Sequence, residues 1–128
     1  MSMSRPTFAG PTDLARVLLI SGAVVLVATA LFHMTGLNSV SGWLDGDRGR
    51  IVALLWSTAA FSWAVVALLW IYAAFRPAEA LRAPVWISTL IPLSVAILLL
   101  VVVEPTHPGG YLLLLSVVLA GIGAWRMH

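Results

Sequence analysis

The sequence contains no cysteine and no lysine, and it is poor in charged residues of either sign. The absence of cysteine excludes disulfides, thiolate metal sites and thiol redox chemistry. Only 9% of the 128 residues are charged, whereas a soluble domain carries about 25%. Too few polar groups remain to cover a surface in water. With 61% hydrophobic residues and a mean hydropathy of +1.02, the chain is predicted to lie in a membrane.

The basic residues are all arginine, and they are scattered singly or in pairs along the chain. A phosphate backbone is bound by a basic stripe, which this chain lacks, so the pI of 9.9 indicates no nucleic-acid partner. We interpret the arginines as topology signals, because arginine gathers in the cytoplasmic loops of membrane proteins.

Four apolar segments follow one another along the chain. About 20 helical residues cross a hydrocarbon core of about 30 Å. Lipid offers no partner to backbone N–H and C=O groups, so each segment is predicted to be helical. None shows the alternating pattern of a membrane β-strand. The predicted fold is all-α, a single four-helix transmembrane domain over residues 1–128, with helices at about 13–33, 51–75, 84–103 and 111–125.

The connections support this division. Asp45-Gly46-Asp47 can cap the second helix, and "RPAEALRAP" (76–84) ends it and places Pro84 in the first turn of the third. "EPTHPGG" (104–110) separates the third helix from the fourth, and the longest loop is predicted between about Met34 and Arg50.

The arginines orient the predicted bundle. If the N-terminus is cytoplasmic, only Arg48 and Arg50 lie outside, and five arginines lie inside: Arg5, Arg16, Arg76, Arg82 and Arg126. This distribution favours cytoplasmic termini in a bacterial inner membrane. Arg5, an apolar run and Ala28-Thr29-Ala30 also resemble a cleaved secretory signal. Because the apolar run continues through Leu31 and Phe32, we favour a membrane span.

Tryptophan recurs every seven residues in the second segment, at Trp56, Trp63 and Trp70. Seven residues make two helical turns less about 20°, so the three indoles share one face. They are predicted to pack as a ridge against a neighbouring helix. Alternatives are a lipid-facing ridge, a contact with another protein, or an aromatic wall for a flat lipid, quinone or pigment.

Small residues recur at the same interval in the first segment, and these would form a groove for the tryptophan ridge. They are Ala15, Gly22, Thr29 and Gly36. The fourth segment has a second small face at Ser116, Ala120 and Gly123. Pro92 interrupts the third segment and predicts a bend there, for which the hydroxyls of Ser88 and Thr89 can compensate.

Ionisable side chains are nearly absent from the predicted spans. Apart from Asp13 and Arg16 at the start of the first, the four segments contain no Asp, Glu, Lys or Arg. This argues against a proton pump, an ion-coupled transporter or a voltage sensor. The sequence has no nucleotide-binding loop, zinc-protease motif or nucleophile elbow, so no catalytic residue and no cofactor are assigned.

The remaining polar candidates gather at the predicted periplasmic end. His33 ends the first helix, Asp45 lies in the long loop, and Glu104 and His107 lie in the hairpin between the last two helices. Two imidazoles with carboxylates would suit a divalent ion such as Zn²⁺. The alternative is a solvated polar rim with Asp–Arg pairs.

The four spans, "LFHMTG" (31–36) and "ALLWSTAAFSWAVVALLW" (53–70) resemble small bacterial membrane proteins of the DoxX-like kind. The resemblance implies a four-helix bundle, and some proteins of that kind act as accessory subunits of membrane oxidoreductases. This chain departs from the DoxX pattern because its helices carry no charge beyond Asp13 and Arg16 at the start of the first, so only the architecture is transferred.

Two functions are predicted from these features. The first is a structural or accessory protein of the inner membrane, which contacts lipids and either another membrane protein or its own copies. The alternative is a binding protein for a metal ion or a small amphiphile, such as a lipid or quinone, at the periplasmic end. An enzyme is less favoured, because no acid–base or nucleophile constellation occurs.

Overall fold

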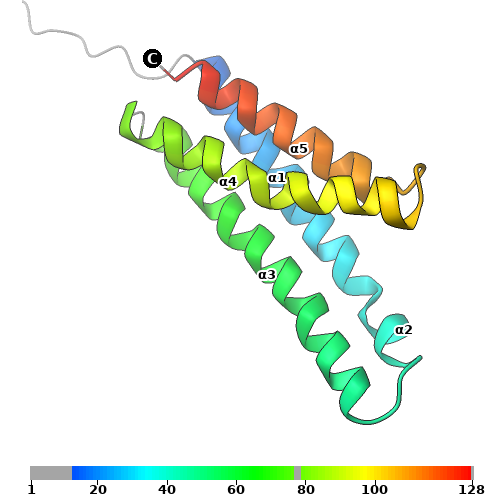
Figure 1. The fold of residues 1–128 in the computed structure, drawn as a ribbon. Helices are drawn as coiled ribbons and strands as arrows, with labels where there is room; N and C mark the ends of the chain where they lie inside the picture. The colour runs from blue at the N-terminus through cyan, green and yellow to red at the C-terminus, as the bar shows by residue number, and fades with distance from the viewer. Residues whose placement is uncertain (1–12, 77–78, 128) are drawn as a thin grey trace, which may run out of the picture.

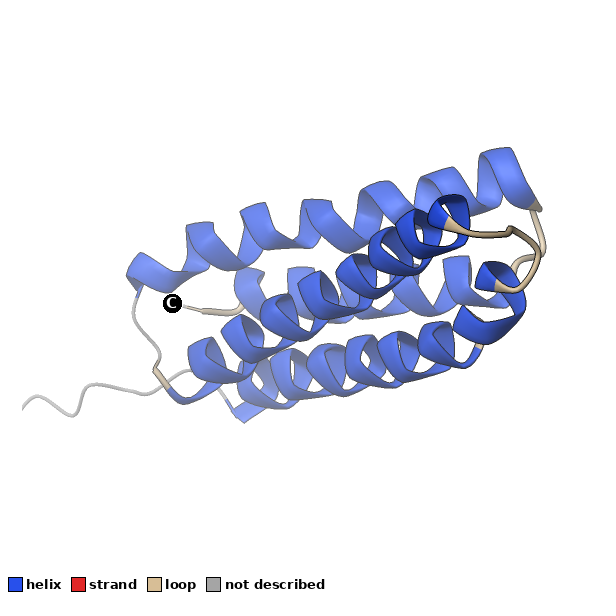
Figure 2. Ribbon diagram, turned by 90° about the horizontal axis from the view of Figure 1, so that it is seen from below, coloured by secondary structure: helices blue, strands red, loops and turns tan. Residues whose placement is uncertain are grey.

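The computed structural model describes residues 13–76 and 79–127. These residues form helices and no strand (Figures 1 and 2). The order is α1 (Asp13–Thr35), α2 (Leu37–Ser41), α3 (Asp47–Phe75), α4 (Glu79–Leu98), the π-helix η1 (Leu99–Val103) and α5 (Pro108–Trp125). Four helices are long and apolar enough to cross a membrane. The prediction of an all-α protein with four such helices is confirmed.

The central helix of the bundle is α1, which packs against both α3 and α5, while α4 packs against α5 and η1 continues it. In Figure 1, α1 begins and α5 ends at the same end of the bundle. We call this the proximal end, and we call the opposite end, which carries α2, η1 and the start of α5, the distal end. Near the proximal end α3 and α4 lie close together, and they diverge toward the distal end (Figure 1).

The helix bounds differ from the predicted ones near glycine and proline residues at the helix ends. The second long helix begins at Asp47 rather than at about residue 51, after Gly46, whose φ of 61° is a conformation that favours glycine. The next begins at Glu79, so Pro84 lies inside the helix and not in its first turn. The last begins at Pro108, because proline suits a position where no N–H partner is needed. The long loop contains α2, which the sequence analysis did not predict.

The core runs along α1 and α3. Trp63 and Trp70 are buried, with alanines one turn away on the same face of α3 at Ala60, Ala67, Ala73 and Ala74. The small side chains let α1 approach closely, and the indoles fill the space between them. A packing role fits both indoles, while Trp56 is half-buried near the distal end.

The small residues of α1 do not form one groove for the tryptophans. A Cβ on Gly22 would lie 3.0 Å from the backbone oxygen of Ser116 and 3.1 Å from the backbone nitrogen of Ala120, both in α5. Gly36, directly after α1, does face the ridge, since its added Cβ would lie 3.1 Å from a ring carbon of Trp56. The expected ridge-in-groove match is therefore wrong at Gly22, where two small faces meet instead. Thr29 is buried, and its hydroxyl donates to Val25 O at 2.7 Å.

Pro92 is buried inside α4, which continues to Leu98. The hydroxyls that were expected to compensate for it have other partners. Ser88 donates to Val85 O, and Thr89 donates to Trp86 O, both at 2.7 Å. The compensation predicted from the sequence is therefore wrong, because each hydroxyl bonds a carbonyl one turn earlier in its own helix.

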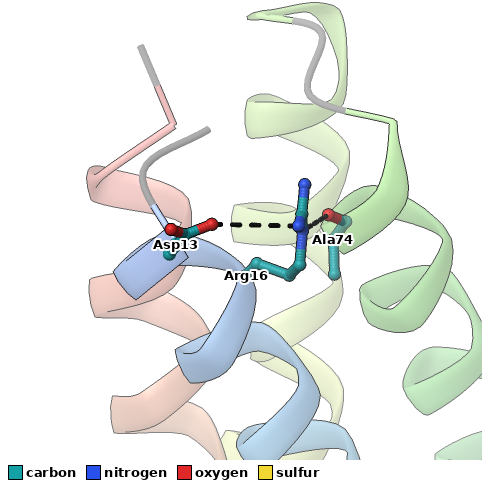
Figure 3. Close-up of polar contacts among 3 residues, drawn as sticks. All are labelled: Asp13, Arg16 and Ala74. Atoms are coloured by element: carbon teal, nitrogen blue, oxygen red, sulfur yellow. Dashed lines mark hydrogen bonds and ion pairs between the residues drawn. The ribbon is translucent and has the colours of Figure 1, made fainter. Parts of the chain in front are cut away.

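Polar contacts between helices close the proximal end. Arg16 Nε donates to Ala74 O at 3.3 Å, and its guanidinium lies 3.9 Å from Asp13 Oδ1 (Figure 3). Because α3 ends at Phe75, the Ala74 carbonyl is one of the groups that a helix leaves without a partner inside itself. A side chain of α1 thus caps the end of α3.

Two further contacts tie α4 into this end of the bundle. Trp70 Nε1 donates to Ser88 Oγ at 2.8 Å, which joins α3 to α4 in the interior. The Arg82 guanidinium lies 5.7 Å from the Trp125 ring centroid, which joins α4 to α5. Every long helix therefore has a side-chain contact to another helix at or toward the proximal end.

Candidate functional site

A cavity of about 190 Å³ lies at the distal end, among residues of α1, α3, η1 and α5. It is partly open to the surface. Most of its lining is apolar or aromatic, and two histidines supply imidazoles. The lining residues are Thr29, Phe32, His33, Thr35, Gly36, Trp56, Trp63, Leu99, His107, Gly109 and Leu113.

His33 and Trp56 form a reciprocal clamp between α1 and α3. Trp56 Nε1 donates to His33 O at 2.7 Å, and His33 Nε2 lies 3.2 Å from Trp56 O. Because a carbonyl only accepts, His33 Nε2 must carry the proton of that second bond. The two rings are stacked, with centroids 4.0 Å apart and planes inclined by 8°. His33 O also accepts from the Gly36 N–H at 3.1 Å, so the tryptophan N–H is the second donor to a carbonyl in the last turn of α1.

His107 holds the start of α5. It is the N-cap residue of this helix, and its Nδ1 accepts from the Gly109 N–H at 3.1 Å. An N-cap side chain normally satisfies a free N–H of the first turn with an oxygen, and here an imidazole nitrogen does so. A Cβ on Gly109 would lie 3.0 Å from His107 Cε1, so the small residue allows the imidazole to fold over the helix start.

The η1 segment contributes part of the cavity wall. The Glu104 N–H donates to Leu99 O at 3.0 Å, which closes a turn one residue wider than an α-helical turn. Leu99 lines the cavity from this turn. Single π-turns occur frequently at functional sites. Nothing in the repetitive run of leucine and valine predicts where the helix widens.

Trp63 forms the deepest aromatic wall of the cavity. Its ring centroid lies 5.0 Å from that of His33, with the planes inclined by 59°. Among the described residues, its Nε1 is the buried side-chain nitrogen or oxygen that has no hydrogen-bond partner. Trp63 therefore contributes packing and a ring surface rather than a polar tie, unlike Trp56 and Trp70.

The predicted carboxylates belong to the polar rim. Asp45 is exposed in the loop before α3, and exposed Glu104 accepts through Oε1 from the Thr106 hydroxyl at 2.7 Å. Asp47 Oδ1 and Arg50 form an exposed ion pair at 3.7 Å. Across residues 13–76 and 79–127, no three His, Cys, Asp or Glu side chains group where they could hold a metal ion.

The structure thus brings together two of the four residues predicted to bind a metal. His33 and His107 line one cavity, while Asp45 and Glu104 are not among its lining residues. The histidines were predictable from the sequence because each lies at the end of a helix. Three apolar lining residues, Phe32, Leu99 and Leu113, were not predicted, since apolar side chains that line a cavity look the same in sequence as those that face lipid.

Comparison of the chain with protein-family models, curated proteins and solved structures gave no match. Function is therefore inferred from the cavity and the helices that form it.

Proposed function

We propose that this protein is a membrane-embedded binding protein that holds one small amphiphile in the distal cavity. The observation that supports this function is an apolar cavity of about 190 Å³ with two imidazoles among its walls. Ligand sites are typically concave and mostly apolar, with a few polar groups that orient the ligand. The distal cavity has this composition.

The position of the cavity supports binding from the membrane. Phe32 and Thr35 line it and are exposed, which supports an entrance beside the last turn of α1. Exposed apolar residues of η1, Val101, Val102 and Val103, surround the same end. An amphiphile could place a head group among the imidazoles while its tail stays among apolar side chains.

We further propose that the distal end faces the periplasm of a bacterial inner membrane. Arg16, Arg76, Arg82 and Arg126 lie in the first or last turns of helices or beside them at the proximal end, and Arg48 and Arg50 lie at the distal end; Arg5 lies outside the described residues. The excess of arginine at the proximal end supports cytoplasmic termini.

A reporter active only in the periplasm should work when fused near Asp45 or His107 and fail near Glu79. The reverse pattern would contradict this orientation.

Lateral association with another membrane protein or a second copy is a second candidate. A wholly apolar groove follows the seam between α1 and α3, and it contains three alanines that would admit another helix closely. Its lining is Val27, Ala30, Leu31, Met34, Ala60, Phe61 and Ala64. An accessory role would use this seam. Ala60→Phe should then abolish a stoichiometric partner or homo-oligomer in mild detergent, and an unchanged complex would exclude the seam.

Filling the cavity tests the binding function. Leu99 lines the cavity, and its neighbour Leu98 is exposed. Leu99→Phe should remove a co-purified amphiphile seen by native mass spectrometry in mild detergent, and Leu98→Phe should retain it, since only the first adds volume inside the cavity. Equal retention by both variants, or no bound amphiphile in the unmodified protein, would contradict the proposal.

A further inference from the structure

The two imidazoles in the cavity wall present different hydrogen-bonding atoms. His33 Nε2 donates to Trp56 O, so the neutral ring keeps an unprotonated Nδ1 that accepts. His107 Nδ1 accepts from the Gly109 N–H, so the neutral ring keeps its proton on Nε2, which donates. No described residue bonds His33 Nδ1 or His107 Nε2. The protein contacts therefore leave one acceptor and one donor on two side chains that line the same cavity.

This pairing is a poor fit for a metal ion. A metal ligand needs a lone pair on the coordinating nitrogen, and the second nitrogen of a metal-bound histidine donates its proton to another group. His33 meets both conditions, because Nε2 donates to Trp56 O. His107 meets neither, because its Nδ1 lone pair is already taken by the Gly109 N–H. Binding a metal at His107 Nε2 would place a proton on Nδ1 and break the cap of α5.

A hydroxyl group fits the pair, because it both donates and accepts. It can donate to His33 Nδ1, and its oxygen can accept from His107 Nε2–H. The surrounding walls select the rest of the ligand. Phe32, Trp56 and Trp63 provide aromatic surfaces, and Leu99 and Leu113 provide aliphatic ones. Aromatic side chains pack favourably against another ring in offset or edge-to-face arrangements.

The volume limits the size of the head group. An apolar cavity of about 150 Å³ holds benzene, so about 190 Å³ holds one six-membered ring with small substituents. A haem or a fused four-ring sterol is too large. Because the cavity is partly open beside exposed Phe32, an alkyl chain on the ring can leave toward the lipid.

We propose that the ligand of the distal cavity is a phenol with an apolar tail, a class that includes the reduced form of quinones. Its ring lies among Phe32, Trp56 and Trp63, and its hydroxyl group binds between His33 and His107. This assignment rests on the proposed binding function and adds the chemical class that the site recognises.

Three probes with the same octyl tail distinguish recognition of the hydroxyl group from binding of the ring: 4-octylphenol, 4-octylanisole and octylbenzene. Binding is measured by isothermal titration calorimetry with the full chain in lipid nanodiscs, after subtraction of empty nanodiscs. The phenol should bind about tenfold more tightly than the anisole, which loses the donor to His33 Nδ1, and more tightly still than octylbenzene. Equal affinities for phenol and anisole would overturn the assignment and leave a cavity that binds rings without recognising a hydroxyl.

Two variants test the named nitrogens. His107→Asn keeps an N-cap acceptor for the Gly109 N–H, and it removes the imidazole donor. His33→Phe keeps a ring against Trp56 and removes the acceptor. Each should weaken 4-octylphenol binding about fivefold to tenfold and leave octylbenzene nearly unchanged. Tyr72→Phe, at an exposed side chain near the proximal end, is the matched control and should bind like the unmodified protein.

The outcomes distinguish the two proposals. If the histidine variants weaken all three probes equally, the imidazoles only shape the cavity, and the phenol assignment is wrong. If no probe binds above empty nanodiscs, or if Leu99→Phe binds all probes unchanged, the distal cavity is not a binding site and the proposed function also fails.

Discussion

The two ends of the bundle use nitrogen-bearing side chains in different ways. At the proximal end, Arg16 caps α3 and Arg82 lies over the ring of Trp125, so both arginine side chains contact a neighbouring helix. At the distal end, each histidine lines a cavity and uses only one of its ring nitrogens in a hydrogen bond to the protein. A satisfied polar group holds helices together, whereas a half-satisfied one beside a void can recognise a ligand.

The contacts of the three tryptophans of α3 also differ between the two ends of the bundle. Trp70 is buried and bonded to Ser88, which ties α3 to α4. Trp63, two turns closer to the distal end, is buried without a polar partner, and half-buried Trp56 bonds the end of α1. Packing thus loosens from Trp70 to Trp56, and the cavity lies beside the two indoles that are not bonded to α4.

The largest expected effect is at the close contact between α1 and α5. Gly22→Leu should destabilise the bundle by about 1–3 kcal/mol or more, because extra volume at a tight contact forces backbones apart. Val24→Leu adds a methylene group at an exposed position and is the control. Thermal unfolding in mild detergent gives the difference. Equal tolerance at both positions would mean that the helices do not meet at Gly22.

A smaller effect is expected from the two buried indoles. Trp70→Phe loses the bond to Ser88, and Trp63→Phe loses no hydrogen bond. Both remove similar volume, so Trp70→Phe should be about 1 kcal/mol more destabilising. Denaturation of the two variants in the same detergent measures this difference. A larger loss of stability from Trp63→Phe than from Trp70→Phe would contradict the looser packing inferred toward the distal end of α3.

The smallest effect is expected from the arginines at the two ends. Arg16→Gln loses a part-buried bond that caps α3 and should cost about 0.5–1 kcal/mol. Arg50→Gln breaks an exposed pair with Asp47 and should change stability by less than about 0.5 kcal/mol. The same unfolding assay compares the two variants. A cost at Arg50 equal to that at Arg16 would mean that the distal rim is held as firmly as the proximal end.

The four long helices were predictable from hydropathy, because in lipid the backbone N–H and C=O groups of each apolar segment must form hydrogen bonds within that segment. The bounds were less predictable, since a helix can begin outside the apolar run, as at Asp47 and Pro108. The π-turn at Leu99 leaves no mark in a run of leucine and valine. The helix that Gly22 contacts could not be predicted either. A small residue indicates that another helix approaches closely, but it does not indicate which one.

The site was predictable only through its polar members. His33 and His107 stood out because each interrupts or ends an apolar segment, and both line the cavity. Asp45 and Glu104 drew the same attention, but the chain places them on the exposed rim. Residues such as Leu99 and Leu113 become part of a site only through the divergence of α3 and α4, which depends on packing over the whole bundle.

Chemical labelling can distinguish the accessible cavity at the distal end from the close contact between α1 and α5. The chain has no cysteine, so single-cysteine variants can be labelled without background. Thr29 and Ser116 are both buried, each with its hydroxyl bonded to a carbonyl of its own helix, but only Thr29 lines the cavity. Labelling of Thr29→Cys and Ser116→Cys with a small thiol reagent in native membranes compares them directly. We predict that Thr29→Cys reacts, and more slowly when 4-octylphenol is present, while Ser116→Cys stays unlabelled. Equal labelling of the two would contradict an accessible cavity at the distal end.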